Sequence, residues 1–428
     1  MTAAEHQPSS AELRPLASAK PLKIALLGYR SAPHVGGQGI YLKYLSSALT
    51  QVGHEVHVYS GPPYPELSQG VTLFKVPSLD LFEATDHTRA LRARHLRSFT
   101  DTWEWWAMLT GGFAEPYTFG RRVAKKLSSS DYDIIHDNQS LAHGLLKLQQ
   151  NGHRVVSTIH HPIHRDRETA LAAAPNWQYR LLVRRWYSFL SMQEKVARRL
   201  NFVTTVSDSS AKDIATCFNR HHDIKVIPNG IDTQAFKPLS IKKSPFRIIT
   251  TASSDQPLKG LTCLLDAFAL VVKQFPQAQL RIIGKLKKGG AAEKRIAHHQ
   301  LQKHISFRSQ LSTEQLVMQY NRASLAACPS LYEGFGLPAG EAMACGLPVV
   351  SSDGGALPEV VGDAGLLVPA GNAEALAKGI LCILREPQLA EELSLRARER
   401  IVNRFCWNHV AENMTNYYQD IIAQTPSC

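Results

Sequence analysis

The segments Lys23-Ile-Ala-Leu-Leu-Gly28 and His54-Glu-Val-His-Val-Tyr59 decide the fold class of this chain. The first is a short apolar run that ends in glycine, which is typical of a buried parallel strand. Between them, apolar residues recur at helical spacing over residues 40–52, and Gly53 supplies a stop signal. The second segment alternates like a strand. A β-α-β unit therefore opens the chain.

The same alternation of strands and helices continues along the chain and is interrupted once. Further strands are predicted at residues 71–76, 134–136, 155–159, 202–206 and 225–227. The polar, proline-bearing stretch 237–245 then breaks the pattern, as linkers do. After it we predict strands at 246–251, 279–283, 325–328 and 348–352 and helices at 313–321, 338–345, 373–384 and 408–423. This pattern predicts an α/β protein with two doubly wound parallel sheets.

Length, charge and cysteine use narrow the class of protein. One hydrophobic core stops growing at roughly 250–300 residues, so a chain of 428 residues is expected to form two domains. Its apolar runs are too short to cross a bilayer, and residues 1–20 lack the apolar core of a secretory signal. Seven scattered cysteines without a C-x-x-C pair favour a cytoplasmic protein. The net charge of +12 indicates an anionic partner, which is a nucleotide, a polyanion or an acidic membrane surface.

The richest chemical signal is the loop Glu333-Gly-Phe-Gly-Leu-Pro-Ala-Gly-Glu341, which joins a strand to a helix with Pro338 in its first turn. Glycines let backbone N–H groups approach a ligand, and a helix N-terminus offers free donors and a positive dipole to a diphosphate. The glutamate at each end can accept hydrogen bonds from sugar hydroxyls. Spacing alone favours an ordinary turn with two solvated glutamates.

The longer segment Ser330-Leu-Tyr-Glu-Gly-Phe-Gly-Leu-Pro-Ala-Gly-Glu-Ala-Met-Ala-Cys-Gly-Leu-Pro-Val-Val350 closely resembles the E-x7-E region of the GT4-type glycosyltransferases. Four other matches follow the family's order: Gly36-Gly37, Ile227-Pro-Asn-Gly-Ile-Asp232, Lys259-Gly260 and Arg404-Phe-Cys-Trp407. The resemblance implies a GT-B fold, in which two Rossmann-like domains face each other across a cleft, and a reaction that retains the configuration of the sugar carbon.

The resemblance also implies how the chain is divided. Residues 22–235 would form the acceptor domain and residues 246–404 the donor domain, which binds a nucleotide diphosphate sugar. A helix at 408–424 would pack back on the first domain. Residues 1–21 read as a disordered tail from their composition.

The resemblance carries over to particular residues of the donor site. Glu341 would hold the ribose hydroxyls, and Glu333 a hydroxyl of the transferred sugar. Gly36 and Gly37 would approach the phosphate from the other domain. The backbone of four consecutive residues would line the sugar and diphosphate: Gly334, Phe335, Gly336 and Leu337.

Lys259 is expected to bind phosphate, because an ammonium at this place can neutralise the leaving diphosphate. The family usually carries an arginine five or six residues earlier, where this chain has Ser253 and Ser254. Either these hydroxyls and another cation, such as Arg281 or Arg308, replace that arginine, or the chain binds phosphate more weakly than its relatives do. A solvated surface lysine is the alternative interpretation of Lys259.

Histidines follow two of the predicted strands in the first domain. His160, in Ser157-Thr-Ile-His-His-Pro162, matches a histidine that lies at the family's reaction centre, and His161 is the fallback. We expect His160 to orient the sugar or the acceptor. His136 also ends a strand, and there a structural role and an acceptor contact are equally compatible with the sequence.

Metal and cofactor binding are not expected. Asp131-Tyr-Asp133 has the D-x-D spacing of metal-binding glycosyltransferases of another fold, but it precedes an apolar strand and reads as a solvated strand entry. The predicted site uses no metal and no cofactor, with the nucleotide sugar as co-substrate.

An aromatic and basic segment leaves membrane contact open. The aromatic residues are Trp103, Trp105, Trp106, Phe113 and Tyr117, and eight arginines and lysines lie at positions 89–126 around them. Aromatic side chains beside cations suit a membrane interface. A helical insertion packed on the first domain fits equally well. The protein is therefore expected in the cytoplasm, with peripheral contact to the inner face of the membrane as an open hypothesis.

The combined prediction is a retaining glycosyltransferase that moves a hexose-type sugar from a UDP or GDP donor to an acceptor hydroxyl by front-face substitution. A lipid-linked or cell-surface glycan precursor is the expected acceptor, and a small hydrophobic natural product is the alternative. A sugar-nucleotide isomerase on the same scaffold is a further alternative. An NAD-dependent oxidoreductase is not favoured, because the G-x-G-x-x-G motif of dinucleotide-binding proteins lacks its third glycine in this sequence. A nucleic-acid-binding protein is not favoured either, because the positive charge occurs without a recognisable nucleic-acid-binding motif.

Overall fold

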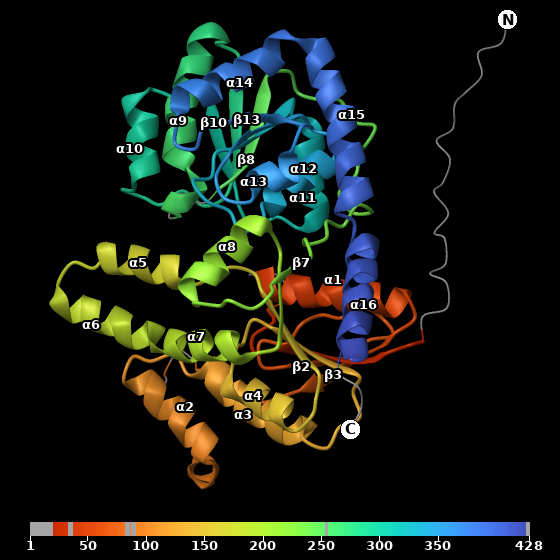
Figure 1. Ribbon diagram of the computed structural model, residues 1–428. Coiled ribbons are helices and arrows are strands. Elements are labelled where there is room, and N and C mark those ends of the chain that lie inside the picture. The colour runs from red at the N-terminus through yellow and green to blue at the C-terminus, as the bar shows by residue number, and fades with distance from the viewer. Residues whose placement is uncertain (1–19, 33–36, 82–85, 87–90, 253–255, 425–428) are drawn as a thin grey trace, which may run out of the picture.

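The chain folds into two domains, each with a parallel sheet covered by helices on both faces (Figure 1). The computed structural model describes residues 20–32, 37–81, 86, 91–252 and 256–424. Four residues of the sequence analysis lie outside the described residues, as does most of the predicted tail: Gly36, Arg89, Ser253 and Ser254. The predicted fold class, two Rossmann-like domains, is confirmed.

The N-terminal sheet has seven strands in the order β3-β2-β1-β4-β5-β6-β7. They are β1 (Lys23–Gly28), β2 (Glu55–Ser60), β3 (Thr72–Lys75), β4 (Ile134–Asn138), β5 (Val155–Ile159), β6 (Phe202–Thr205) and β7 (Lys225–Val226). All neighbouring strands pair in parallel; in the centre, Ile24 of β1 is in register with Val56 and Ile134. Apolar residues face both layers of helices, which explains the unbroken apolar run of β1.

The helices of this part of the chain lie between successive strands in the sequence. They are α1 (Gly37–Gln51), η2 (Ala93–Arg97), α2 (Phe99–Leu109), α3 (Glu115–Leu127), α4 (His143–Gln150), α5 (His164–Ala172), α6 (Trp177–Trp186), η3 (Tyr187–Phe189), α7 (Leu190–Arg199) and α8 (Asp208–Cys217). In Figure 1, α2, α3 and α4 lie on the side of this domain away from the C-terminal domain, and α8 lies next to the C-terminal domain.

The C-terminal sheet has six parallel strands in the order β10-β9-β8-β11-β12-β13. They are β8 (Arg247–Thr251), β9 (Gln279–Ile283), β10 (Ile305–Arg308), β11 (Leu325–Cys328), β12 (Val349–Ser352) and β13 (Leu366–Val368). The helices are η4 (Pro257–Lys259), α9 (Leu261–Gln274), α10 (Ala291–His298), α11 (Thr313–Arg322), α12 (Leu337–Ala344), α13 (Leu357–Val361), α14 (Ala373–Arg385), α15 (Pro387–Arg404) and α16 (Trp407–Gln424).

The last helix returns to the N-terminal domain (Figure 1). Val410, Met414 and Tyr418 of α16 are buried in one apolar cluster with Leu42 and Leu45 of α1. Packing of such an apolar helix face removes its side chains from water, at roughly 1.5–3 kcal/mol for each large one. The chain therefore crosses between the domains twice.

The elements differ from the predicted ones at two sheet edges, at one helix start, and in the helices α10, α13 and α15, which were not predicted. Strands β10 and β13 were not predicted, because both are short edge strands with partly exposed residues and weak apolar signals. Helix α1 begins at Gly37, before the predicted start near Ile40. The first N–H groups of a helix have no partner inside the helix, so glycines are tolerated there.

Candidate active site between the domains

The Glu333 loop ends at position 336, where only glycine fits without strain. The loop follows β11, and Gly336 caps the start of α12 with φ 101°. A Cβ at Gly336 would lie 2.8 Å from Cδ2 of Leu357. This left-handed residue turns the chain directly into α12, so the N-terminus of the helix and the Glu333 side chain lie at the same place.

Lys259 and Glu333 form an ion pair, with 2.7 Å between Nζ and Oε1. The hydroxyl of Ser330 donates to the same carboxylate oxygen over 2.8 Å. Lys259 ends the short helix η4, and Gly260 follows it with φ 66°, where a Cβ would overlap the carbonyl oxygen of Pro329. Two residues predicted to bind donor therefore touch each other at the end of the C-terminal sheet.

Glu341 lies one helical turn further along, in a desolvated position. Burial raises the pKa of its carboxyl to about 7, although the hydroxyl of Tyr320 donates to it over 3.3 Å and opposes the rise. Tyr44 of α1 approaches from the other domain. Burial, Asp232 and Glu341 together raise the pKa of the Tyr44 phenol. Glu341 is thus a carboxyl group poised to titrate near neutral pH between the two domains.

The Glu333 loop rests directly on the N-terminal domain. The carbonyl oxygen of Gly334 accepts hydrogen bonds from the hydroxyls of Ser207, at 2.7 Å, and Ser210, at 3.1 Å. A Cβ at Gly334 would lie 3.3 Å from the carbonyl oxygen of His160. The structure therefore places His160 beside the loop that carries Glu333, as the sequence predicted for two residues of one site.

His160 is held in one orientation and in one protonation state. Its Nε2 lies 2.7 Å from Oδ1 of Asn138, whose amide nitrogen donates to the carbonyl oxygen of Gln38 over 3.1 Å. That amide contact makes Oδ1 the acceptor, so Nε2 of His160 carries the proton and Nδ1 keeps its lone pair. Burial, helped by nearby His161 and His136, lowers the pKa of His160 to about 3. The ring is a neutral hydrogen-bonding group.

The two other histidines differ from His160. His136 is 1% exposed and uses both ring nitrogens, at 2.5 Å from the Tyr418 hydroxyl and 2.6 Å from the Thr158 hydroxyl. Of the two roles left open for His136, these contacts favour the structural one, because neither ring nitrogen is free to contact an acceptor substrate. His161, the fallback, is exposed and lies 3.7 Å from Asp166.

Two further sets of predicted residues lie elsewhere. Asp131 and Asp133 both contact Lys23, at its Nζ and backbone N–H, where β1 begins. Burial lowers the pKa of Arg281, and its charged neighbours are the cations Arg308, Arg247 and Arg322. Arg281 therefore belongs to an arginine cluster, and no ion pair between this cluster and Glu333 is found among the described residues.

The glycines and apolar residues of the predicted site differ in how tightly they are packed. Gly37 starts α1, and nothing lies within 4 Å of a Cβ built on it. The ring of Phe335 is 6% exposed and packs edge-on against Phe405, with 5.8 Å between ring centroids. The ring of Phe335 is therefore part of the apolar core, and its predicted backbone contact with the donor stays a prediction, while Leu337 begins α12.

Sequence reasoning missed residues that hold the predicted ones. Asn138 and Gln139 orient His160; the Gln139 side chain accepts from the His160 backbone N–H over 2.7 Å. Tyr320 reaches Glu341 from α11. Trp407 stacks on Tyr44 with ring centroids 5.6 Å apart. Asn138 and Gln139 follow His136 at the end of β4, and this place at a strand end was the only feature of the sequence that could have indicated a role in the site.

Two facing Rossmann-like domains, with a carboxylate-bearing glycine loop at a helix start between them, define a glycosyltransferase of the GT-B fold. The family described as Glycosyltransferase Family 4 matches residues 35–235, and the family described as Glycosyl transferases group 1 matches residues 232–400. A protein from Mycolicibacterium hassiacum named MMP alpha-(1->4)-mannosyltransferase is 43% identical over 95% of this chain and 100% of its own length. The chain belongs to glycosyltransferase family 4.

Solved structures agree with this fold. Sucrose-phosphate synthase from Thermosynechococcus elongatus superimposes with a TM-score of 0.68 at 24% identity, over 94% of this chain and 100% of that one. Anabaena HepE, solved in complex with UDP, gives 0.67 at 18% identity, over 93% and 100%. Within the described residues, no helix has the length and apolar character needed to span a membrane. No group of three or more potential metal ligands occurs in that part of the chain either.

Proposed function

We propose that this protein is a retaining mannosyltransferase that moves mannose from a nucleoside diphosphate donor, with guanine or uracil as base, to a sugar hydroxyl. The observation that carries this proposal is the ion pair of Lys259 and Glu333 beside the start of α12. A cation, a helix N-terminus and a carboxylate suit the diphosphate and the sugar of one donor. The choice of mannose rests on the relative with 43% identity, whose name is a mannosyltransferase.

The chemistry follows from charges at the site. The bond between the sugar carbon and the diphosphate oxygen breaks, and a new bond to the acceptor oxygen forms on the same face. Lys259 and the dipole of α12 stabilise the departing diphosphate, and a phosphate oxygen takes the acceptor proton. Glu341 holds the ribose hydroxyls, and Glu333 accepts from a sugar hydroxyl. His160 orients sugar or acceptor through its neutral ring.

Donor entry requires the domains to separate. The Glu359 carboxylate of the C-terminal domain accepts hydrogen bonds from the backbone N–H groups of Asp208 and Ser209 in the N-terminal domain, so contacts between the domains already occupy this region. Gly334 already contacts the N-terminal domain through Ser207 and Ser210. We therefore infer that the described arrangement is the closed one, and that opening exposes the Glu333 loop to the nucleotide sugar.

The acceptor is proposed to be a glycan that ends in mannose, formed as a lipid-linked or cell-surface precursor in the cytoplasm. A peripheral membrane contact is part of this proposal. Four apolar side chains along η2 and α2 support it, because they are 37–63% exposed at helical spacing: Leu96, Phe99, Trp103 and Trp106. Phe113, by contrast, stacks on Trp186 and belongs to a packed cluster.

Product analysis tests the function. The protein is incubated with GDP-mannose, UDP-mannose, GDP-glucose or UDP-glucose and an α-linked mannobiose, and the products are examined by mass spectrometry and proton NMR. We expect one added hexose in α linkage from a mannose donor, undiminished by EDTA. A β linkage would refute retention, and transfer of glucose alone would refute the sugar. Donor converted to an epimer without acceptor would favour the isomerase instead.

A further inference from the structure

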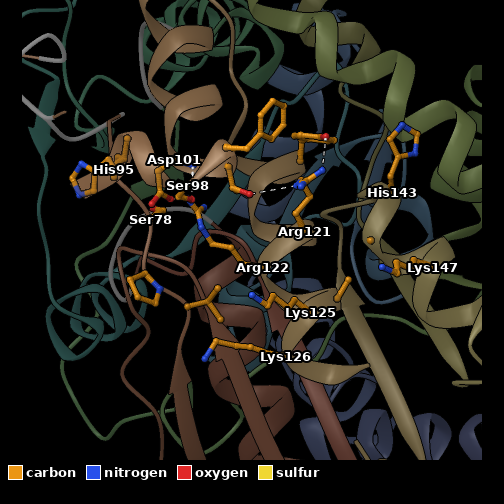
Figure 2. Close-up of a pocket in the computed structure, with 18 of the residues that line it drawn as sticks. Ser78, His95, Ser98, Asp101, Arg121, Arg122, Lys125, Lys126, His143 and Lys147 are labelled. Carbon is orange, nitrogen blue, oxygen red and sulfur yellow. Dashed lines mark hydrogen bonds and ion pairs between the residues drawn. The ribbon is translucent and has the colours of Figure 1, made fainter. Parts of the chain in front are cut away.

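A large groove lies on the N-terminal domain between η2–α2 and α3–α4. The helices α2, α3 and α4 lie on the side of this domain away from the C-terminal domain and the candidate active site (Figure 1). Its volume is about 1050 Å³. Figure 2 shows Arg121, Arg122, Lys125 and Lys126 along α3, with His95 and Asp101 on one side and His143 and Lys147 on the other. Neither the family match nor the proposed reaction assigns a role to it.

One wall of the groove is a built structure held by a buried carboxylate. Glu104 of α2 is 2% exposed and accepts from the Leu79 backbone N–H at 2.9 Å and the Thr118 hydroxyl at 2.8 Å. Its second oxygen lies 2.7 Å from Nη1 of Arg122, and Asp101 lies 2.5 Å from Nη2 of the same guanidinium. The two acids fix α2 on α3 and neutralise Arg122.

The remaining cations of the groove have no such compensation. Asp101 is the one acidic side chain among the described lining residues, and it is paired with Arg122. Arg121 is oriented by neutral groups: it donates to the Thr100 and Tyr117 hydroxyls and lies 5.2 Å from the centre of the Phe99 ring. Lys125 and Lys147 form no ion pair with any described residue.

This distribution of charge selects the chemistry of a ligand. A concave site lined by one sign of charge focuses its field and concentrates ions of opposite sign. Six arginine and lysine side chains line the groove against one acid, so an occupant with a single charge would leave most of them unmatched. Phosphate oxygens accept several charge-assisted hydrogen bonds at once from guanidinium and ammonium groups. A neutral glycan acceptor could accept hydrogen bonds from these cations, but it would leave their positive charge unmatched.

We propose that the groove is a second anion site, which binds a ligand bearing two or more phosphate charges through Arg121, Lys125 and Lys147. It is separate from the donor site and goes beyond the proposed transfer reaction. Two sources carry this chemistry: a soluble diphosphate, or the phosphate headgroups of an anionic lipid surface beside the exposed Trp103 and Trp106. The contacts at the groove are the same for both.

Binding of inorganic pyrophosphate, followed by isothermal titration calorimetry, tests the site without any assay of turnover. The titration uses Lys259→Gln protein, so that pyrophosphate at the donor site does not interfere. We expect binding that weakens by about 100-fold when Lys125→Gln and Lys147→Gln are added, since each lost charge-assisted contact is worth roughly one factor of ten. The control adds Lys273→Gln and Lys303→Gln, two exposed lysines of the C-terminal domain, and removes equal charge.

Sedimentation with phosphatidylcholine vesicles, with and without phosphatidylglycerol, distinguishes the two sources. Pyrophosphate binding without vesicle binding assigns a soluble ligand. Vesicle binding that needs phosphatidylglycerol, Lys125 and Lys147, and is lost in Trp103→Ala/Trp106→Ala, assigns the lipid surface. The proposal is overturned if neither probe binds, or if the control pair weakens binding as much as the groove pair does. Failure of the mannosyl transfer assay would leave both measurements unaffected.

Discussion

The ammonium of Lys259 lies 2.7 Å from a carboxylate oxygen of Glu333, although 74 positions separate them in the sequence. Without donor, the cation expected to meet the diphosphate is already neutralised by the acid expected to meet the sugar. Donor binding would therefore break this ion pair and replace it with a contact between Lys259 and the diphosphate and a contact between Glu333 and the sugar. Both groups are partly exposed, at 29% and 13%, so water lowers what the exchange costs.

The first prediction concerns this pair. Lys259→Gln is expected to reduce kcat by about 100-fold or more, because the charge that stabilises the leaving diphosphate is lost in the transition state. Glu333→Gln leaves Lys259 without its acid and is expected to keep or tighten binding of the nucleoside diphosphate while turnover falls. Steady-state kinetics and calorimetry separate the two effects. Equal losses of nucleotide affinity in both variants would contradict the assigned roles.

Glu341 is predicted to make donor binding depend on pH. Its pKa of about 7 means that it is partly protonated near neutral pH, and only the carboxylate accepts from both ribose hydroxyls. Nucleotide affinity should therefore rise between about pH 6 and about pH 8, and calorimetry of Glu341→Gln should show a weaker, flat dependence.

The same shift predicts an opposite effect on the stability of the free protein. A carboxyl group whose pKa is raised by folding keeps its proton in the folded state above its unfolded pKa of about 4.3, so stability is lost as pH rises towards 7. Glu341→Gln should melt at a temperature closer to wild type at about pH 5 than at about pH 8. A constant difference across this range would exclude a raised pKa.

His160 is predicted to act without gaining a proton. With a pKa of about 3 it is neutral throughout the working range, so it should add no step near pH 6.5 to the kcat/KM profile of Glu341→Gln, in which the titration of Glu341 itself is removed. Asn138→Asp places a carboxylate 2.7 Å from Nε2 and should introduce such a step by raising the His160 pKa. His160→Ala with full turnover would remove this histidine from the site.

Glu359 is predicted to hold the domains closed. Its carboxylate in α13 accepts from the backbone N–H groups of Asp208, at 2.8 Å, and Ser209, at 2.9 Å, at the start of α8 in the other domain. Charged groups at a helix N-terminus contribute about 0.5–2 kcal/mol. Glu359→Gln should therefore increase the radius of gyration in solution scattering and leave the melting temperature within a few degrees. The neighbouring contact of Tyr332 and Asp213 offers an independent variant, Tyr332→Phe.

Alanine variants of Gly336 and Gly37 are predicted to distinguish the effect of backbone strain from the loss of a ligand contact. Gly336→Ala should lower the free energy of unfolding by about 1–2 kcal/mol, because an L side chain at φ 101° is strained and meets Leu357. Gly37→Ala has open space around the new methyl and should keep stability. If Gly37 approaches the phosphate as predicted, the same variant weakens donor binding. Chemical denaturation and calorimetry provide the two readouts.

Much of this protein could be predicted from its sequence, because the decisive patterns are local. Apolar runs such as Lys23–Gly28, helical periodicity and stop signals such as Gly53, with φ 98°, report on neighbouring residues only, and they predicted two Rossmann-like domains. The loop Glu333 to Glu341 carries its glycines and acids within nine consecutive positions. Its resemblance to the family was therefore readable without coordinates.

The tertiary structure alone decided which side chains meet. Lys259 pairs with Glu333, and His136 is hydrogen-bonded to Tyr418, because the folded chain brings together residues that are far apart in the sequence. The groove beside α3 is positively charged because Glu104 and Asp101, both on α2, pair with Arg122, and Lys125 and Lys147 have no acid of their own among the described lining residues. Charge and burial depend on these long-range neighbours, and a sequence pattern contains only the near ones.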